Sequence, residues 1–391
     1  MSFAAVDSWA KDLVDSNHLA NTDITIYRKG MIAYESHYGY ADLQGQRPLK
    51  ENMIFRIYSM TKPVVSAAVL MLIEDEKLNI SDPVSKFIPE FANPQVVKFE
   101  NGQDIGRVAA RSPVTVHHLM THTAGMTYGG EANPPVSTSY RKHGVDFSLA
   151  YAQLDELAAI AGTQPLYAQP GTQWIYSIAS DILGRVIEVA SGLSLDQFLE
   201  KRIFTPLQMT DTAFHVPQEK QSRFVSNFGY DRAGNLEDRS SGSDDRFLRN
   251  GTLLSGGSGL VSTSRDYLEF TKMLLGRGTC GNIQVLKPSS IDQMTRNQLP
   301  GDLPSMGCAV HGNMDMAGIG YGYGVSVTVD KSRASVACSN GDYGWAGVAN
   351  TYFWVDPAEK MIVLFLSQLM PATDMPIRAD LRRLVYDKIG V

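Results

Sequence analysis

The sequence predicts an α+β fold in which both ends of the chain contribute strands to one antiparallel sheet. Two observations lead to this prediction. Strand-like patterns are concentrated near the two termini, and the region between them shows helical spacing and long loops. We therefore expect a discontinuous α/β sheet domain of residues 1–60 and 313–391, with helices flanking the sheet, and an inserted, mainly helical domain of residues 61–312. An active site is expected between the two domains.

The first elements are predicted to be a helix and a β-hairpin. In "MSFAAVDSWAKDLVDS", apolar residues such as Val6, Trp9 and Leu13 share one helical face. In "DITIYRKGMIAYESHYGYAD", two β-rich runs meet at Arg28-Lys29-Gly30, which is typical of a hairpin turn. Because the first segment lacks the unbroken apolar centre of a signal peptide, we expect a cytoplasmic protein.

The middle of the chain is predicted to be mostly helical. The segments "PVTVHHLMTHTAGM", "ASDILGRVIEVASG" and "SLDQFLEKRIF" have helical spacing. The run after Lys62, "PVVSAAVLMLI", is apolar on all sides, so its helix should be buried. The polar segments "GEANPPVSTSYRKHG" and "DRSSGSDDRFLRNG" are expected to be long loops that either cover a site or connect helices in solvent.

Strand patterns return near the C-terminus. They are found in "YGYGVSVTVD", in "RASVACSNGD" and in "NTYFWVDPAEKMIVLFLSQ", and the last of these folds back at Asp356-Pro357. Apolar residues at Ile377, Leu381 and Leu384 then have the spacing of a closing helix. These strands are the second source of the predicted sheet.

Charge and composition exclude several classes of protein. The chain holds 35 Lys and Arg against 41 Asp and Glu, for a net charge of −6, and no basic cluster suggests nucleic acid as a partner. No uncharged apolar run approaches the roughly 20 residues of a membrane-spanning helix. Cys280, Cys308 and Cys338 are odd in number and lack metal-ligand spacing, which predicts reduced thiols.

Ser59 and Lys62 form a candidate catalytic pair in "SMTK". Pro63 favours a helix that starts here, because proline is tolerated in a first turn, and this places Ser59 at or next to the N-cap. Residues three apart on such a turn share a face, so Lys62 can act as a base for a Ser59 nucleophile. The same spacing recurs as Ser8-Trp9-Ala10-Lys11, however, so the motif alone is not specific.

Tyr176 is a second candidate, just ahead of the apolar positions of a predicted helix in "WIYSIASDILG". It could face an active site. Tyrosine also commonly occupies boundary positions with its hydroxyl in water, so Tyr176 supports a catalytic role only in combination with other residues.

The chain resembles the serine hydrolases related to class C β-lactamases and D,D-peptidases, and among them the family VIII carboxylesterases. The resemblance rests on "SMTK", "VHHLMTHTAGM", "WIYSIASDILG", "SGGSGLVST" and "GWAGVANTYFWVDP", in the family's order. It implies a β-lactamase/transpeptidase-like fold, with Ser59 as nucleophile, Lys62 as neighbouring base and Tyr176 as the general base that reprotonates the leaving group. It also implies an oxyanion hole made by the backbone N–H groups of Ser59 and Val348.

Two departures from the lactamases favour esters over β-lactams. Their Tyr-x-Asn motif would place Asn where this chain has Ile178, and their Lys-Thr-Gly motif is replaced by Trp345-Ala346-Gly347. The resemblance therefore implies a substrate pocket formed by Trp345, Gly347 and Ile178, to which Tyr128 is added because it matches a pocket position in similar esterases.

Three other signals do not indicate a cofactor or a metal. His118 and His122 are four apart but lack the His-Glu-x-x-His pattern, so packing and capping explain them. "SGGSGL" around Ser258 does not complete a nucleophile elbow, because Leu260 stands where the last glycine would be. "GIGYGYG" lacks dinucleotide-binding spacing. We predict no metal and no cofactor.

The functional prediction is a serine carboxylesterase that hydrolyses short-chain acyl esters through an acyl-enzyme on Ser59. Its expected partner is a small-molecule ester, and the sequence leaves the oligomeric state open. One alternative is an acyltransferase that uses the same acyl-enzyme. A second is a β-lactamase-like or D,D-peptidase-like hydrolase with weak β-lactam turnover. A third, from a different class, is a non-catalytic binding protein on a hydrolase scaffold.

Overall fold

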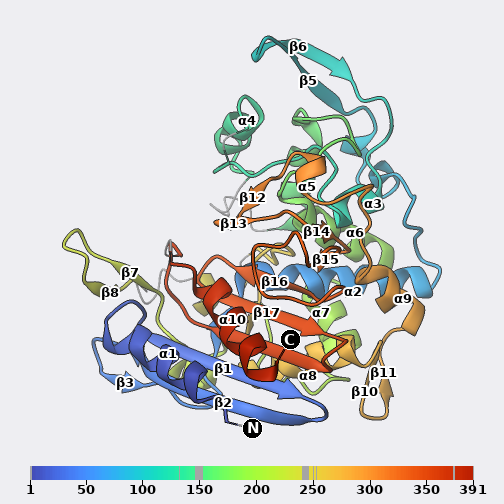
Figure 1. Cartoon of the computed structure of the whole chain (residues 1–391). Coiled ribbons are helices and arrows are strands. Elements are labelled where there is room, and N and C mark those ends of the chain that lie inside the picture. Colours follow the sequence, from blue (N-terminus) through green and yellow to red (C-terminus); the bar gives the residue numbers. More distant parts are fainter. Residues whose placement is uncertain are drawn as a thin grey trace.

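The computed structural model describes residues 2–131, 133–145, 153–239, 246–249, 251, 253–372 and 375–390. Its main feature is an eight-stranded antiparallel sheet with the strand order β14-β15-β16-β17-β18-β1-β2-β3 (Figure 1). The strands are β1 (Asn21–Arg28), β2 (Met31–Asp42), β3 (Arg47–Pro48), β14 (Ile319–Tyr321), β15 (Ser326–Thr328), β16 (Tyr343–Gly347), β17 (Thr351–Asp356) and β18 (Met361–Leu366). Both chain ends therefore build one sheet, which confirms the predicted fold class.

Strands β1 and β18 join the two ends of the chain. They pair in antiparallel register, with Ile24 opposite Phe365. All residues of β18 are buried, which fits its unbroken apolar sequence because the strand is covered on both faces. Between β1 and β2, Lys29 and Gly30 have φ values of 52° and 92°, as in tight two-residue turns, and this confirms the predicted hairpin.

Helices cover both faces of the sheet. Helices α1 (Ala4–Asp15) and α10 (Ile377–Ile389) pack side by side in front of it in the view of Figure 1. Helix α8 (Ser264–Leu275) packs on the opposite face. Neighbouring residues of β17 show both faces, because Phe353 contacts Tyr267 of α8 and Trp354 stacks with Tyr386 of α10.

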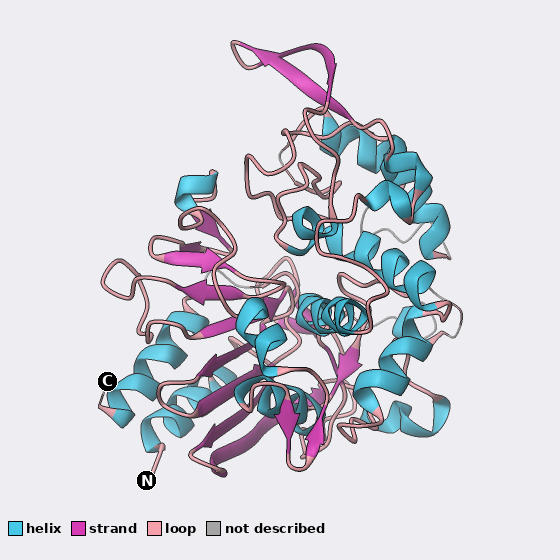
Figure 2. Ribbon diagram, turned by 90° about the vertical axis from the view of Figure 1, so that its right-hand side faces the viewer, coloured by secondary structure: helices cyan, strands magenta, loops and turns pink. Residues whose placement is uncertain are grey.

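The remaining helices form the part of the molecule that contains α2 (Thr61–Glu74). Residues Thr61 to Leu72 of α2 are all buried, and this confirms the burial predicted for the apolar run after Lys62. The helix packs against α6, which in turn contacts α3, α5 and α7, and Figure 2 shows helices gathered beside the sheet. These helices are α3 (Val116–Met120), α4 (Val136–Lys142), α5 (Leu154–Thr163), α6 (Ala179–Ser191), α7 (Leu195–Leu199) and α9 (Pro288–Met294).

Helix α8 lies within residues 61–312, which the sequence assigns to the helical domain, yet it packs on the sheet. Its amphipathic pattern shows that one face is buried but does not identify the partner. The domain boundaries at residues 60 and 313 stay a prediction.

The middle region also contains strands that its helical spacing did not predict. Strands β5 (Gln95–Glu100) and β6 (Gln103–Ala109) form a hairpin that projects from the helical part (Figure 1). Its turn is Asn101-Gly102, with both residues at positive φ. Further two-stranded pairs are β4 (Phe55–Arg56) with β9 (Val261–Ser262), β7 (Phe228–Tyr230) with β8 (Leu236–Asp238), β10 (Thr279–Cys280) with β11 (Ile283–Gln284), and β12 (Val310–His311) with β13 (Met314–Asp315).

The strand predicted from "RASVACSNGD" is wrong, because residues 333–342 form turns and loop. Contacts between side chains and backbone compete with strand pairing here, because Arg382 donates to the Ala337 carbonyl oxygen at 3.2 Å and the Lys331 N–H donates to Asn340 Oδ1 at 2.7 Å. Ser332 donates its backbone N–H to Asp330, and the buried Asp342 carboxylate pairs with Arg382 of α10 at 2.7 Å.

The predicted polar loops are only partly covered by the structure. The first contains the short helix α4, and the second includes residues 240–245 and 250, which lie outside the described residues. None of the helices in the described ranges has the length and apolarity needed to cross a membrane. The cytoplasmic location stays a prediction.

Candidate active site

Ser59 lies in a 3₁₀ turn, Tyr58–Met60, directly before α2. The N-cap of α2 is Met60, so Ser59 is next to the N-cap, as expected. Tyr58 has a φ of 43°, a left-handed value that is unusual for an aromatic residue and that marks a strained turn. The turn places Ser59, which is 8% exposed, on the wall of a cavity of about 1050 Å³.

Lys62 is fully buried beneath Ser59. Its Nζ donates to Ser59 Oγ at 3.2 Å and to the Gly257 carbonyl oxygen at 2.8 Å. The same Nζ lies 4.6 Å from the centre of the Tyr176 ring. Within the described part of the chain, Lys62 forms no ion pair with a carboxylate. The structure thus brings Ser59, Lys62 and Tyr176 together at one point.

A buried aspartate, Asp181 of α6, holds the loop that contacts Lys62. Its Oδ1 accepts from Ser255 Oγ at 2.6 Å and from the Gly257 N–H at 3.1 Å. A Cβ atom on Gly257 would lie only 2.6 Å from Asp181 Oδ2, so the carboxylate would have to move if any other residue stood there. The glycines of "SGGSGL" therefore permit a tight loop, and Asp181 positions Lys62 through it.

Tyr176 is enclosed by aromatic rings. Their centres lie 4.9 Å away for His122 and His311, 5.4 Å for Tyr128 and 5.6 Å for Trp345. Burial lowers the pKa of His311 to about 4 and holds that of His122 well below its usual value, and the Lys62 charge contributes to both shifts. Both imidazoles are therefore neutral at neutral pH. The rings fix the orientation of Tyr176 without adding charge.

The end of strand β16 lies against the segment that leads to Ser59. A Cβ atom on Gly347 would lie 2.6 Å from the Ile57 carbonyl oxygen, so the two backbones meet closely at a glycine. Thr351, which faces Gly347 across the hairpin, donates its hydroxyl to the same carbonyl at 3.4 Å. These contacts hold the Gly347–Val348 peptide beside the nucleophile turn.

The cavity wall includes most of the predicted pocket. Ser59, Tyr176 and Val348 line it, and so do Tyr128, Trp345 and Gly347. Ile178 does not line it, because this residue is the N-cap of α6 and is buried with 2% exposure. The resemblance predicted Ile178 as a pocket residue from its place two residues after Tyr176, but the turn into α6 directs it to the core.

His118, His122 and Ser258, which the sequence analysis did not assign to a metal site or a nucleophile elbow, make structural contacts. The Nδ1 atom of His118 accepts the Thr115 backbone N–H at 3.2 Å and so caps α3. His122 contacts Ser177 Oγ at 3.2 Å. Ser258 accepts from Arg246 through its carbonyl oxygen at 3.1 Å.

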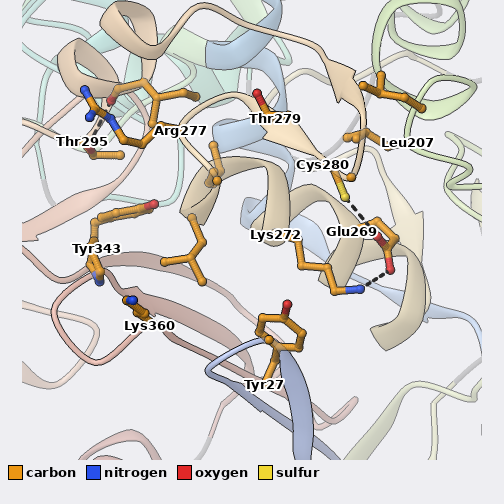
Figure 3. Close-up of a pocket in the computed structure, with 18 of the residues that line it drawn as sticks. Tyr27, Leu207, Glu269, Lys272, Arg277, Thr279, Cys280, Thr295, Tyr343 and Lys360 are labelled. Atoms are coloured by element: carbon orange, nitrogen blue, oxygen red, sulfur yellow. Dashed lines mark hydrogen bonds and ion pairs between the residues drawn. The ribbon is translucent and has the colours of Figure 1, made fainter.

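A second cavity, of about 1290 Å³, lies away from these residues (Figure 3). In its wall, Glu269 accepts from Lys272 at 2.8 Å and from the Cys280 thiol at 3.2 Å. Burial and this carboxylate raise the pKa of Cys280 to about 11, so the thiol is a poor nucleophile. The reactive arrangement is therefore at the first cavity.

The site residues predicted from the sequence do not include Asp181, Gly257 or His311. Asp181 stands out as a carboxylate among the apolar positions of its helix, which could have suggested a buried role. His311 and Gly257 reach the site from distant parts of the chain.

The comparisons with known proteins agree with the fold. The family described as Beta-lactamase matches residues 6–387. The chain is 30% identical over 364 residues to Protein Rv1367c of Mycobacterium tuberculosis (strain ATCC 25618 / H37Rv), covering 92% of this chain and 88% of that protein. It is 27% identical over 398 residues to Esterase EstB of Burkholderia gladioli, covering 98% and 95%.

A solved structure described as "EstCE1, a hydrolase with promiscuous acyltransferase activity" superimposes with a TM-score of 0.82 at 25% identity, covering 98% of both chains. The family match, which spans nearly the whole sequence, confirms the resemblance found in the motifs. The chain therefore belongs to the beta-lactamase family of serine hydrolases.

Proposed function

We propose that the protein is a serine carboxylesterase of the family VIII type, which hydrolyses short-chain acyl esters through an acyl-enzyme on Ser59. The observation that carries this proposal is the 3.2 Å contact between Lys62 Nζ and Ser59 Oγ, on the wall of a cavity and beside the Tyr176 ring. A serine with a base in reach and room for a substrate is the arrangement that nucleophilic catalysis requires.

In the proposed mechanism, Lys62 and Tyr176 act together as the base that takes the Ser59 proton while Oγ attacks the ester carbonyl. The backbone N–H groups of Ser59 and Val348 bind the oxyanion that forms. The C–O bond to the alcohol then breaks, and the alcohol leaves with a proton from Tyr176. Water attacks the acyl-enzyme, a proton returns to Ser59 Oγ, and the carboxylic acid is released.

Trp345 supports an ester substrate rather than a β-lactam. It replaces the lysine that would hold the lactam carboxylate, and it lines the cavity next to Tyr176. Ile178 lies in the core and does not line the cavity, so it does not affect the choice of substrate.

We expect kcat/KM for p-nitrophenyl butyrate to exceed that for nitrocefin by at least about tenfold. A missing charge-assisted hydrogen bond costs about 1.5–3 kcal/mol, which corresponds to about a ten- to hundredfold loss of rate. Both substrates should be assayed on one preparation. Nitrocefin values equal to or above the ester values would replace the esterase proposal with a lactamase.

Acyl transfer is the second candidate, and the size of the cavity favours it. About 1050 Å³ leaves room for an acceptor alcohol beside an acylated Ser59. EstCE1 is described as having promiscuous acyltransferase activity. Hydrolysis and transfer are separated by adding benzyl alcohol to the ester assay and measuring the ratio of benzyl butyrate to butyric acid.

A further inference from the structure

Arg378 lies in the first turn of α10 and lines the same cavity as Ser59. Its Nη2 donates to the Gly347 carbonyl oxygen at 3.4 Å. No carboxylate among the described residues pairs with it. One turn later, Arg382 differs in this respect, because it forms a buried ion pair with Asp342 at 2.7 Å. Arg378 and Arg382 therefore have different surroundings, although they lie one turn apart on the same helix.

The guanidinium of Arg378 lies between the β12–β13 turn and the ring of Tyr352. The turn between β12 and β13 closes over it, since a Cβ atom on Gly312 would lie 3.2 Å from Nη1. The Tyr352 ring centre is 5.6 Å from its Cζ. Burial lowers the pKa of Arg378, because it removes water from the cation. The side chain is half-buried and lines the cavity, so its charge lies close to the groups of the cavity wall.

The carbonyl that Arg378 contacts belongs to the peptide that carries the Val348 N–H. In a planar trans peptide, the C=O and the following N–H point in opposite directions. A cation at the carbonyl oxygen polarises the amide and strengthens its N–H as a donor, as in a cooperative chain of hydrogen bonds. The contact is long in the free protein, and contacts of this kind tighten when charge develops in the transition state.

We propose that Arg378 is a positioning residue for the oxyanion hole, which fixes the Gly347–Val348 peptide and strengthens the Val348 N–H. This inference rests on the proposed function. The competing role is that of a cation that binds a carboxylate of the substrate directly. The two roles differ in their effect on neutral esters, since a positioning residue acts on every substrate that forms an oxyanion.

The test compares R378M and R378K with the wild type on three substrates. These are p-nitrophenyl butyrate, its thionoester analogue in which sulfur replaces the carbonyl oxygen, and mono-p-nitrophenyl glutarate, which carries a carboxylate. R383M is the matched control, because Arg383 is on the same helix but its side chain is 57% exposed and pairs only loosely with Asp380 and Asp387. Thermal unfolding of each variant checks the fold.

We expect R378M to lower kcat for p-nitrophenyl butyrate about tenfold, which corresponds to about 1.4 kcal/mol of transition-state stabilisation. KM should change less than about twofold. The ratio of kcat for the oxygen ester to kcat for the thionoester should fall as well, because sulfur gains less from N–H donors placed for oxygen. R378K should restore part of both effects, and R383M should match the wild type.

An unchanged kcat on p-nitrophenyl butyrate, or a loss confined to the glutarate ester and expressed in KM, would overturn the positioning role. A loss of kcat with an unchanged thionoester ratio would also contradict it, since general damage to the site slows both esters alike. If the wild type hydrolyses none of the esters, the proposed function fails first, so the two failures are distinguishable.

Discussion

Replacing Ser59 with alanine is expected to reduce kcat for p-nitrophenyl butyrate by about 10³-fold or more, because the variant has no nucleophile to form the acyl-enzyme. Two serines provide matched controls. Ser8 has the same spacing to Lys11, but Lys11 pairs with Asp7 at 2.8 Å on the surface. Ser258 lies on the wall of the same cavity but is bound by Arg246.

S8A is expected to match the wild type, and S258A should keep most of the activity. Steady-state kinetics on the four purified proteins make the comparison, with thermal unfolding as a check on folding. Comparable losses in S59A and S258A would refute the assignment of the nucleophile.

The second large effect is expected at Lys62 and Tyr176. Each of K62M and Y176F should lower kcat by about 10²-fold or more, because the two residues share one proton transfer. Methionine retains most of the volume of the fully buried Lys62 side chain, so the packing of α2 is largely preserved. Phenylalanine keeps the ring that lies 4.6 Å from Nζ and removes only the hydroxyl.

The double variant K62M/Y176F decides whether the two residues act as a unit. Groups that act together are strongly non-additive, so the double variant should be hardly slower than the slower single variant. The measurement is a double-mutant cycle on kcat for p-nitrophenyl butyrate. Losses that multiply would show independent roles and would contradict the shared proton transfer.

The fold could be predicted as far as local patterns determine it. The β-rich runs and the turns at Lys29-Gly30 and Asp356-Pro357 indicated the sheet, and they required only short-range information. The position of α8 on the sheet could not be predicted, because its amphipathic pattern does not name a partner. The β5–β6 hairpin was missed although Asn101-Gly102 is a strong local turn signal.

In the candidate site, too, local contacts could be predicted from the sequence and contacts made by the tertiary fold could not. Ser59 and Lys62 are three residues apart on one turn, so their contact followed from helix geometry. Tyr176 needed the resemblance, because nothing near it in the sequence places it beside Lys62. Asp181 and Arg378 act through backbone contacts with Gly257 and Gly347, which the fold alone brings near. The prediction that Ile178 lines the pocket was wrong for a similar reason. The path of the chain into α6 determines where its side chain lies, and the sequence does not show that path.

The most direct test of a covalent role for Ser59 uses a p-nitrophenyl ester of a short alkyl phosphonate, whose adduct on a serine resembles the tetrahedral intermediate. The wild-type protein should release one equivalent of p-nitrophenol per chain and lose its esterase activity in proportion. Mass spectrometry of the digested protein should locate the phosphonyl group on the peptide that contains Ser59. Complete modification of another residue, or esterase activity that persists after Ser59 is modified, would contradict the acyl-enzyme on Ser59.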